Sequence, residues 1–257
     1  MTWLSIITVV RDDESGLSRT RDAIEVNDRN GVEWVVIDSS HDRAAIKTLV
    51  DGIGRYEWVP PEGIYPAMNH ALDLAAGEYV LFLNAGDELY SPDTVTSVRK
   101  AITKSSCSWA YGQIEIIEDT GATIMSSLKD YHAEKHYFFA RGSFPPHQGT
   151  FARVSDLRAL GGFDPSYSIA ADYKAFLQLT QQSDPLVLSS VIARFPAGGA
   201  SSQHWFQALG EFHRARVEVL APSGGAALRE RALTVVHAAR TSAYRLVVER
   251  ARRWARR

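Results

Sequence analysis

The first 90 residues alternate short apolar runs with segments of helical periodicity, and only a few residues join one to the next. Strands are expected at 3–10, 33–37, 56–59 and from 79 onward, and helices at 17–26, 43–50 and 65–75. Gly77 is expected to end the third of these helices. Strands linked by crossover helices run parallel, with right-handed crossovers. The alternation therefore predicts an α/β fold with a Rossmann-like sheet.

The fourth apolar run, YVLFL, ends abruptly in Asn84, Ala85, Gly86 and Asp87. Five apolar residues suit a strand that is buried on both faces, and the Asn-Ala-Gly-Asp turn cannot extend it. A carboxylate is thus expected at the carboxyl end of a central strand, the edge at which open α/β sheets bind ligands. A carboxylate there can hold a divalent cation against phosphate oxygens. The alternative is an ordinary polar turn after a core strand.

Beyond Asp87 the chain no longer alternates strictly between strands and helices. The expected elements are a helix at 92–104, an antiparallel pair of strands at 109–117 and 123–127, and a helix at 169–180. Asp172 lies at the start of the last helix. A mixed sheet with mostly parallel strands and an antiparallel part is therefore predicted, in one domain over residues 1–220.

Residues 221–257 form a separate extension, which begins with a hinge at 222–225 and continues as an arginine-rich helix. Apolar residues at helical spacing define one side, namely Leu233, Val236, Ala243, Tyr244, Val247, Ala251 and Trp254. Such a basic amphipathic helix is typical of one lying on an anionic membrane surface, where each basic residue contributes on the order of 1 kcal/mol. The alternative is a helix that packs its apolar side on the domain and leaves its arginines in water.

Composition argues against several classes of protein. The 257 residues carry a net charge of −2 and one cysteine, so neither a polyanion-binding protein nor a disulfide or cysteine-zinc site is expected. No run approaches the roughly 18 apolar residues of a spanning helix, and no signal peptide is visible. Nothing is typical of a nucleic-acid module. We expect a cytoplasmic protein, peripheral at the inner face of the plasma membrane through its C-terminal helix.

Five segments, taken in order, resemble the family 2 glycosyltransferases of the GT-A fold. They are LSIITVV (4–10), VEWVVIDSSHD (32–42), GIYPAMNHAL with GEYVLFLNAGD (63–72 and 77–87), HQGTF (147–151) and GGFDPSYSIAADY (161–173). The resemblance covers roughly residues 4–180 and is to a subgroup that decorates bacterial polysaccharides and glycolipids. It implies an inverting enzyme that transfers a single sugar from a UDP, dTDP or GDP donor to a polysaccharide-precursor or lipid-linked acceptor.

The resemblance implies that Asp87 holds a divalent cation, Mn²⁺ or Mg²⁺, which neutralises the leaving diphosphate. The family usually shows Asp-x-Asp followed by a further Asp at this point. The present chain has Asn84 and Gly86 where the first two acids would stand. Asp87 is therefore expected to carry most of the metal binding, with help from the carbonyl oxygen of Asn84.

The resemblance also assigns roles to two other acids. Asp172 is implied as the general base that removes the proton from the acceptor hydroxyl. The family motif there is commonly Glu-Asp, and Ala171 replaces the Glu in this chain. Asp38 is implied as an acceptor of hydrogen bonds from the nucleotide base or ribose. For both aspartates the alternative is a residue that caps the following helix.

The remaining candidates surround these acids. Nucleotide-sugar binding is expected from Val9, Arg11, Asn69, Asn84 and Ala85, an acceptor or metal-side role from His147 and Gln148, and closure over the diphosphate from a polar loop at 198–204 that includes His204. Each has a structural alternative: a solvated Arg11, a locally hydrogen-bonded Asn69, a structural His147 and an ordinary surface turn at the loop.

Two other functions remain open from the residues. A sugar-phosphate nucleotidyltransferase usually carries a glycine-rich basic loop after the first strand, whereas residues 11–16 are acidic with one glycine. A non-catalytic nucleotide-sugar-binding or scaffold protein is the third reading, since Asn84 and Gly86 replace two acids. Nucleotide binding with and without manganese would separate the three.

Overall fold

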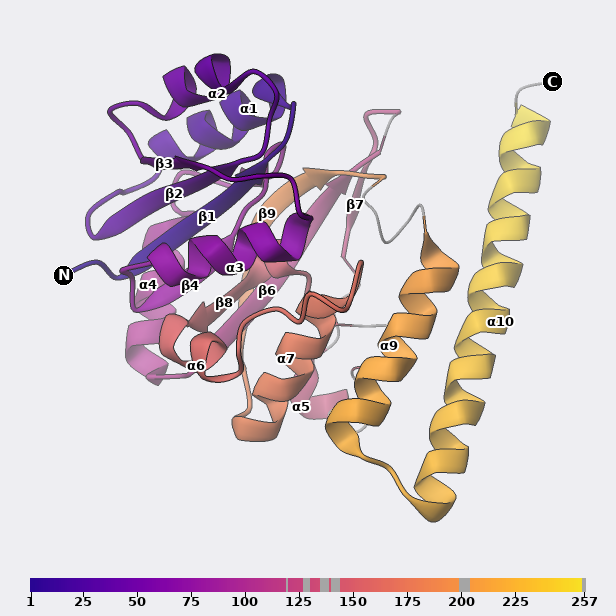
Figure 1. Cartoon of the computed structure of the whole chain (residues 1–257). Coiled ribbons are helices and arrows are strands. Elements are labelled where there is room, and N and C mark those ends of the chain that lie inside the picture. Colours follow the sequence, from indigo (N-terminus) through magenta and orange to yellow (C-terminus); the bar gives the residue numbers. More distant parts are fainter. Residues whose placement is uncertain (119, 127–129, 135–138, 140–143, 199–203, 256–257) are drawn as a thin grey trace.

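A computed structural model describes the chain except residues 119, 127–129, 135–138, 140–143, 199–203 and 256–257. The described strands form one mixed sheet in the order β3-β2-β1-β4-β8-β6-β9-β5, with β7 paired to β6 (Figure 1). The four strands predicted in the first 90 residues are present and run parallel. They are β1 (Leu4–Val10), β2 (Val32–Asp38), β3 (Arg55–Trp58) and β4 (Tyr79–Phe82).

The later residues contribute the antiparallel part of the sheet. β8 pairs antiparallel with β4 and β6, while β9 runs parallel to β6. The predicted antiparallel pair is confirmed as β6 and β7, although residue 127 lies outside the described residues. The sequence pattern predicts neither β8 nor β9. The elements are β5 (Glu88–Leu89), β6 (Trp109–Ile117), β7 (Thr123–Met125), β8 (Thr150–Arg153) and β9 (Leu186–Pro196).

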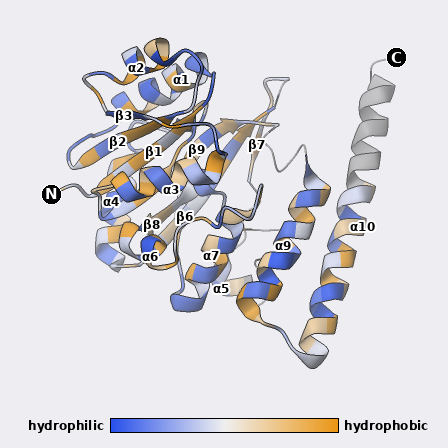
Figure 2. Ribbon diagram, viewed as in Figure 1, coloured by the Kyte–Doolittle hydropathy of each residue, from blue (hydrophilic) through white to orange (hydrophobic). Residues whose placement is uncertain are grey.

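Side chains alternate between two apolar cores, one on each face of the sheet. On β2, Val35 and Ile37 join one core, and Trp34 and Val36 join the other. Burial on both faces explains why these strands are continuous apolar runs. Figure 2 shows the apolar strands enclosed by helices. One face is covered by α3 (Ile64–Leu74), α6 (Val154–Ala159), α7 (Ala171–Gln182) and α9 (Trp205–Leu220), the other by α1 (Glu14–Glu25), α2 (Arg43–Val50) and α4 (Thr94–Ser105).

Gly77 has a different role from the one expected. α3 ends at Leu74, and Ala75 already has extended backbone. A Cβ atom at position 77 would lie 2.5 Å from the backbone nitrogen of Ser5. Gly77 therefore permits the chain to pass close to β1 on its way into β4, and it does not cap the helix.

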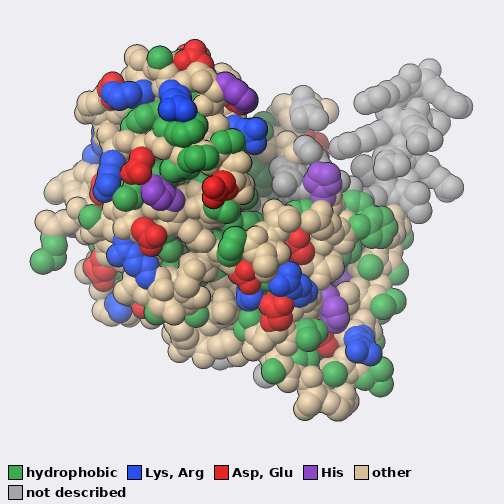
Figure 3. Space-filling view, viewed as in Figure 1, with side chains coloured by type: hydrophobic (Ala, Val, Ile, Leu, Met, Phe, Trp, Pro, Cys, Tyr) green, Lys and Arg blue, Asp and Glu red, His purple; other side chains and the backbone are tan. Residues whose placement is uncertain are grey.

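The C-terminal helices stand at one side of the sheet (Figure 1). α9 packs on α7, and α10 (Gly224–Ala255) begins within the predicted hinge and packs on α9. α10 turns Glu230 inward and leaves Leu228, Val235 and Val236 exposed. Figure 3 shows hydrophobic side chains gathered on the surface of these two helices. Within the described residues, no helix combines the length and apolarity needed to cross a bilayer.

Candidate active site

The carboxyl ends of β1, β2 and β4 meet at one edge of the sheet, where a cavity of about 240 Å³ opens. Three residues expected to bind the donor, Val9, Arg11 and Asn84, line this cavity. Ala85 lies beside it, since its backbone nitrogen donates to the carbonyl of Val9 at 3.2 Å. The other lining residues are Val10, Ser39, Pro61, Gly63, Ile64 and Ala67. The edge predicted from the strand ends is thus a cavity with mixed apolar and polar walls.

Asp38 ends β2 but is fully buried and is not among the residues that line the cavity. The Tyr56 hydroxyl donates to Asp38 Oδ2 at 2.7 Å, and the Ser40 nitrogen donates to Oδ1 at 2.7 Å. Burial and then Asp38 raise the pKa of Tyr56, which keeps this hydroxyl a donor. Asp42, not Asp38, caps α2. Asp38 therefore shapes the turn behind Ser39, and its contact with a nucleotide stays a prediction.

The turn after β4 is held from α1 by Thr20. The Thr20 hydroxyl donates to the carbonyl of Asp87 at 2.7 Å and accepts from the Gly86 nitrogen at 3.0 Å. Gly86 has a φ of +94°, which favours glycine. Within the turn, the Asn84 nitrogen donates to Asp87 Oδ2 at 3.0 Å. Burial raises the pKa of Asp87 to about 7, although nearby His147 and the hydrogen bonds from Asn84 and Gln148 oppose this rise.

His147 joins the turn after β4 to the N-terminus of α7. It lies in the short helix η1 (His147–Gly149), and its Nδ1 is 3.1 Å from Asp172 Oδ2. Its Nε2 is 3.2 Å from Asn84 Nδ2. Burial alone would lower the pKa of His147, but the Asp172 carboxylate, together with Asp87, raises it overall. One imidazole thus connects the metal side expected at Asp87 with the expected base.

Asp172 lies in the first turn of α7 and is 8% exposed. The Tyr65 hydroxyl of α3 lies 3.2 Å from Asp172 Oδ1, and the Tyr173 nitrogen donates to the same oxygen at 2.9 Å. With His147 on Oδ2, both carboxylate oxygens have partners from separate parts of the chain. These contacts fix the direction in which the carboxylate points.

Asn69 does not line the cavity. Its Nδ2 donates to the carbonyl of Phe163 and its Oδ1 accepts from the Phe163 nitrogen, each at 2.7 Å. A Cβ atom on neighbouring Gly162 would lie 2.4 Å from Asn69 Oδ1. These contacts favour the structural alternative, in which Asn69 fastens the Gly161-Gly162-Phe163 loop to α3, over a role on the diphosphate.

Gln148 and His204 have opposite environments. Gln148 is buried, and its side chain hydrogen-bonds to Asp87. His204 is exposed immediately before α9, outside the hydrogen-bonded cluster of Asn84, His147 and Asp172. Most of the loop predicted to close over the diphosphate, 199–203, lies outside the described residues.

Asp87 is buried and, unlike Asn84, is not among the residues that line the cavity. Among the residues that the structure describes, no three His, Cys, Asp or Glu side chains converge to hold a metal ion by themselves. Within the described residues, the Oδ1 atom of Asn84 is buried and has no hydrogen-bond partner. One carboxylate and one amide oxygen, completed by phosphate oxygens, match the way Mn²⁺ or Mg²⁺ is held in nucleotide sites.

Two residues of this region were missed by sequence reasoning. Tyr65 of α3 contacts Asp172 of α7, and Tyr56 of β3 contacts Asp38 of β2, so that each contact joins two different elements of the fold. The only signal in the sequence is the position of Tyr65 within the quoted segment GIYPAMNHAL. A tyrosine in an amphipathic helix is otherwise indistinguishable from a core residue.

Comparison with known proteins agrees with this geometry. The sequence profile described as glycosyl transferase family 2 matches residues 5–160. An uncharacterised glycosyltransferase of Mycobacterium tuberculosis is 27% identical over 208 residues, which cover 77% of each chain. A PGL/p-HBAD biosynthesis glycosyltransferase of Mycobacterium bovis is 32% identical over 118 residues, or 44% of this chain and 41% of that one.

Solved structures share the fold at low sequence identity. S. aureus TarS 1–349 in complex with UDP-GlcNAc superposes with a TM-score of 0.66 at 14% identity, covering 91% of this chain and 70% of that one. Mannosyltransferase PcManGT from Pyrobaculum calidifontis, in complex with GDP-Man and Mn²⁺, gives a TM-score of 0.62 at 15% identity over 96% of this chain and 79% of that one. The mixed sheet is therefore a GT-A fold. With more than half of its length matched by the family profile, the chain belongs to glycosyl transferase family 2 and is a glycosyltransferase.

Proposed function

We propose that this glycosyltransferase moves a single sugar from a nucleotide-sugar donor to an acceptor hydroxyl, with inversion at the anomeric carbon. The observation that carries the proposal is one continuous cluster: a cavity lined by Val9, Arg11 and Asn84, next to Asp87, with His147 linking Asn84 to Asp172. A donor site, a candidate cation position and a candidate base therefore lie side by side at the edge where α/β sheets bind ligands.

In this proposal Asp172 is the general base. Its carboxylate takes the proton from the acceptor hydroxyl while that oxygen forms a bond to the anomeric carbon. The bond from the anomeric carbon to the diphosphate breaks on the opposite side, and the nucleoside diphosphate leaves with the electron pair. The Tyr173 nitrogen and His147 hold the two carboxylate oxygens, so that Asp172 needs little reorganisation to act.

The leaving diphosphate is placed beside Arg11 and Asn84. Arg11 is mostly exposed at the cavity wall and offers a cation to phosphate oxygens. Asp87 and the Oδ1 atom of Asn84 would hold a Mn²⁺ or Mg²⁺ ion. A bound cation would stabilise negative charge on the leaving group as a Lewis acid. The complexes of UDP-GlcNAc with TarS and of GDP-Man and Mn²⁺ with PcManGT support a donor of this class.

The acceptor is proposed to be a polysaccharide precursor or a glycolipid at the cytoplasmic face of the membrane. One relative is named for PGL/p-HBAD biosynthesis, which supports a glycolipid product. Residues 221–257 are proposed as an extension that lies on the membrane surface. Exposed Leu228, Val235 and Val236 on α10 support this, since they leave apolar surface at helical spacing. Of the apolar side predicted from the sequence, Val236 belongs to this exposed set, and Leu233 instead lines the cavity between α10 and α9.

Thermal shift with UDP-, dTDP- and GDP-sugars, each with and without Mn²⁺, tests the donor proposal. The matching donor should raise the unfolding temperature, because a ligand that binds only the folded state stabilises it by mass action. An Arg11→Ala variant should reduce this shift. If no nucleotide sugar changes the unfolding temperature, the chain is better explained as a non-catalytic descendant.

Binding to anionic vesicles tests the membrane proposal. The triple variant Leu228→Ser, Val235→Ser and Val236→Ser should bind phosphatidylglycerol vesicles about tenfold less tightly, because it removes exposed apolar surface without touching the core. The matched triple variant Val26→Ser, Ile124→Ser and Met125→Ser, at exposed apolar residues outside α9 and α10, should leave binding unchanged. Equal binding by both variants would contradict a membrane role for this face.

A further inference from the structure

α9 contacts the loop that leads into Asp172. The Glu211 carboxylate accepts three hydrogen bonds from consecutive backbone nitrogens of that loop, those of Ser168 at 3.1 Å, Ile169 at 2.9 Å and Ala170 at 2.9 Å. Ala170 is the N-cap residue of α7 and has no side chain that can cap the helix. Glu211 therefore supplies from α9 the negative charge and the acceptors that this helix start would otherwise lack.

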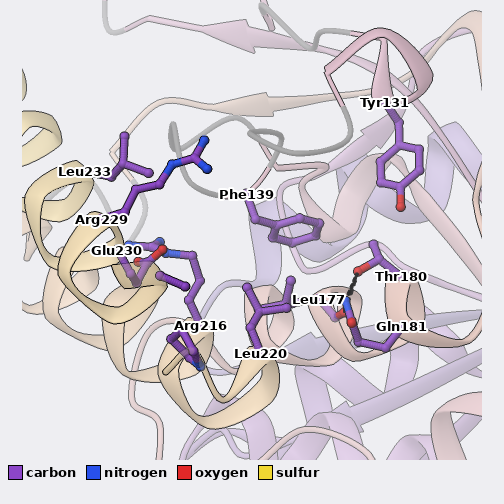
Figure 4. Close-up of a pocket in the computed structure, with 12 residues that line it drawn as sticks. Tyr131, Phe139, Leu177, Thr180, Gln181, Arg216, Leu220, Arg229, Glu230 and Leu233 are labelled. Atoms are coloured by element: carbon purple, nitrogen blue, oxygen red, sulfur yellow. Dashed lines mark hydrogen bonds and ion pairs between the residues drawn. The ribbon is translucent and has the colours of Figure 1, made fainter. Parts of the chain in front are cut away.

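α9 also holds the residue on the other side of Asp172. Arg216 is buried, and its Nη1 donates to the Tyr173 hydroxyl at 2.8 Å. Its Nε donates to Glu230 of α10 at 2.5 Å, and its Nη2 donates to Thr234 at 2.9 Å. Figure 4 shows Arg216 and Glu230 close together at the wall of a cavity of about 460 Å³ between α7, α9 and α10. Each of the three guanidinium nitrogens thus donates to a partner.

We propose that Glu211 and Arg216 are positioning residues for Asp172, so that α9 sets the orientation of the general base. This inference rests on the proposed function of Asp172. Glu211 holds the backbone nitrogens of 168–170, which precede Asp172 with only Ala171 between them, and Arg216 holds the hydroxyl of Tyr173, the residue after Asp172. A displacement of about 1 Å at a catalytic group can lower turnover about 100-fold, so small shifts of this loop matter.

The other restraints on this loop act on different atoms, and Arg214 of α9 adds two by donating to the carbonyl of Ser166 at 3.2 Å and to its hydroxyl at 2.9 Å. Tyr65 donates to the carbonyl of Ile169 at 2.5 Å, and the Asp164 side chain accepts from the Ser166 nitrogen at 2.9 Å. The backbone nitrogens of 168–170 have Glu211 as their acceptor. Replacing the carboxylate with an amide removes one acceptor oxygen and the negative charge, which leaves at least one of the three donors to water or to strain next to the base.

Glu211→Gln tests the proposal, with Glu218→Gln as the matched control. Glu218 lies on the same helix and also has three partners, but these are the side chains of Tyr167, Lys174 and Arg214. Hydrogen exchange of the amides at 168–170 should become about tenfold faster or more in Glu211→Gln and stay unchanged in Glu218→Gln. This measurement needs no donor or acceptor.

Turnover gives the second measurement. Release of nucleoside diphosphate from the donor that the thermal-shift screen selects should show kcat lowered about tenfold or more in Glu211→Gln, with the donor KM within about twofold of wild type. Tyr173→Phe, which removes the partner of Arg216 and keeps the ring, should lower kcat in the same way. Glu218→Gln should retain the wild-type kcat.

Faster exchange at 168–170 together with an unchanged kcat would overturn the positioning role. Unchanged hydrogen exchange in Glu211→Gln would also overturn the positioning role, because it would show that the Glu211 carboxylate does not hold the loop. Retained turnover in Asp172→Asn would instead refute the proposed function of the base, whatever the exchange rates show.

Discussion

The proposed donor edge and the proposed general base are built by different kinds of contact. The donor edge consists of the ends of β1, β2 and β4. These strands are joined by short crossovers, and β2 and β4 each pair parallel with β1. Asp172 instead stands at the start of a helix whose approach is fixed by Tyr65, His147 and Glu211, from three distant segments. Binding of the donor should therefore tolerate changes in the C-terminal helices, whereas turnover should not.

Asp172→Asn should have the largest effect, and it tests most directly whether donor binding and turnover depend on different parts of the site. Asparagine keeps the size of the side chain and one acceptor oxygen but cannot take a proton, so sugar transfer should fall by a factor of about 10³. Donor affinity, measured by thermal shift, should stay near that of the wild type because Asp172 does not line the donor cavity. Turnover close to the wild-type value would remove Asp172 from the chemistry.

Arg216→Ala should lower the free energy of unfolding through the contact between α9 and α10. It leaves the Glu230 carboxylate buried without its cation, which typically costs about 3–5 kcal/mol. Denaturant unfolding measures this change. The double change Arg216→Met with Glu230→Leu is the control, since replacing a whole buried pair with apolar side chains is often nearly neutral. An equal loss in both variants would show that packing, not charge, is responsible.

Asp87→Asn should weaken Mn²⁺-dependent donor binding about 100-fold, the usual scale for removing one partner of a buried charge contact. Titration calorimetry with the selected donor measures it, and binding without Mn²⁺ should change little. The pKa of Asp87 is raised to about 7, and a cation needs the ionised carboxylate. Wild-type affinity with Mn²⁺ should therefore rise between pH 6 and 8, while that of Asp87→Asn stays flat.

Lys174→Met should have the smallest effect. Lys174 contacts Asp164 and Glu218, each at 2.7 Å, and so joins α7 to α9. Burial alone would raise the pKa of Asp164, but Lys174 lowers it to about 2, and Lys174 likewise lowers the pKa of Glu218 to about 2.

Both folded pKa values are below the ordinary ones, so this stabilisation is present above about pH 4.5 and is lost as the pH falls toward 2. Because the carboxylates are about one-third exposed, we expect about 1 kcal/mol at pH 7, or a few degrees in Tm. A Tm difference from wild type that persists at pH 2 would contradict an electrostatic origin.

The sequence predicts the donor half of the site better than the base half, for a physical reason. β1, β2 and β4 are buried on both faces and so appear as apolar runs that end in polar turns. The four residues of β8 become a strand only through pairing with β4 and β6, and the pairing of β9 with β6 is interrupted by shifts in register. Such pairings depend on residues far away in the chain and leave no local period.

The same distinction applies to single residues. Asp87 and Asp172 could be selected because each stands in a recognisable motif at the end or start of an element. Glu211 carries no such signal, since the three nitrogens that it binds lie 41–43 residues earlier in the chain. Asn69 is the opposite case: it stands in one of the quoted motifs, but its side chain makes two hydrogen bonds to the backbone of Phe163.

The backbone of the turn after β4 limits which of its positions can carry a further carboxylate. Thr20 holds the turn through its hydroxyl, so the fold of the turn does not depend on a bound cation. Asn84→Asp is a single-step exchange of similar size in ordinary backbone, whereas any side chain at Gly86 meets a φ of +94°. An added acid is therefore compatible with the backbone at position 84 and not at position 86, so selection for tighter cation binding would act on position 84.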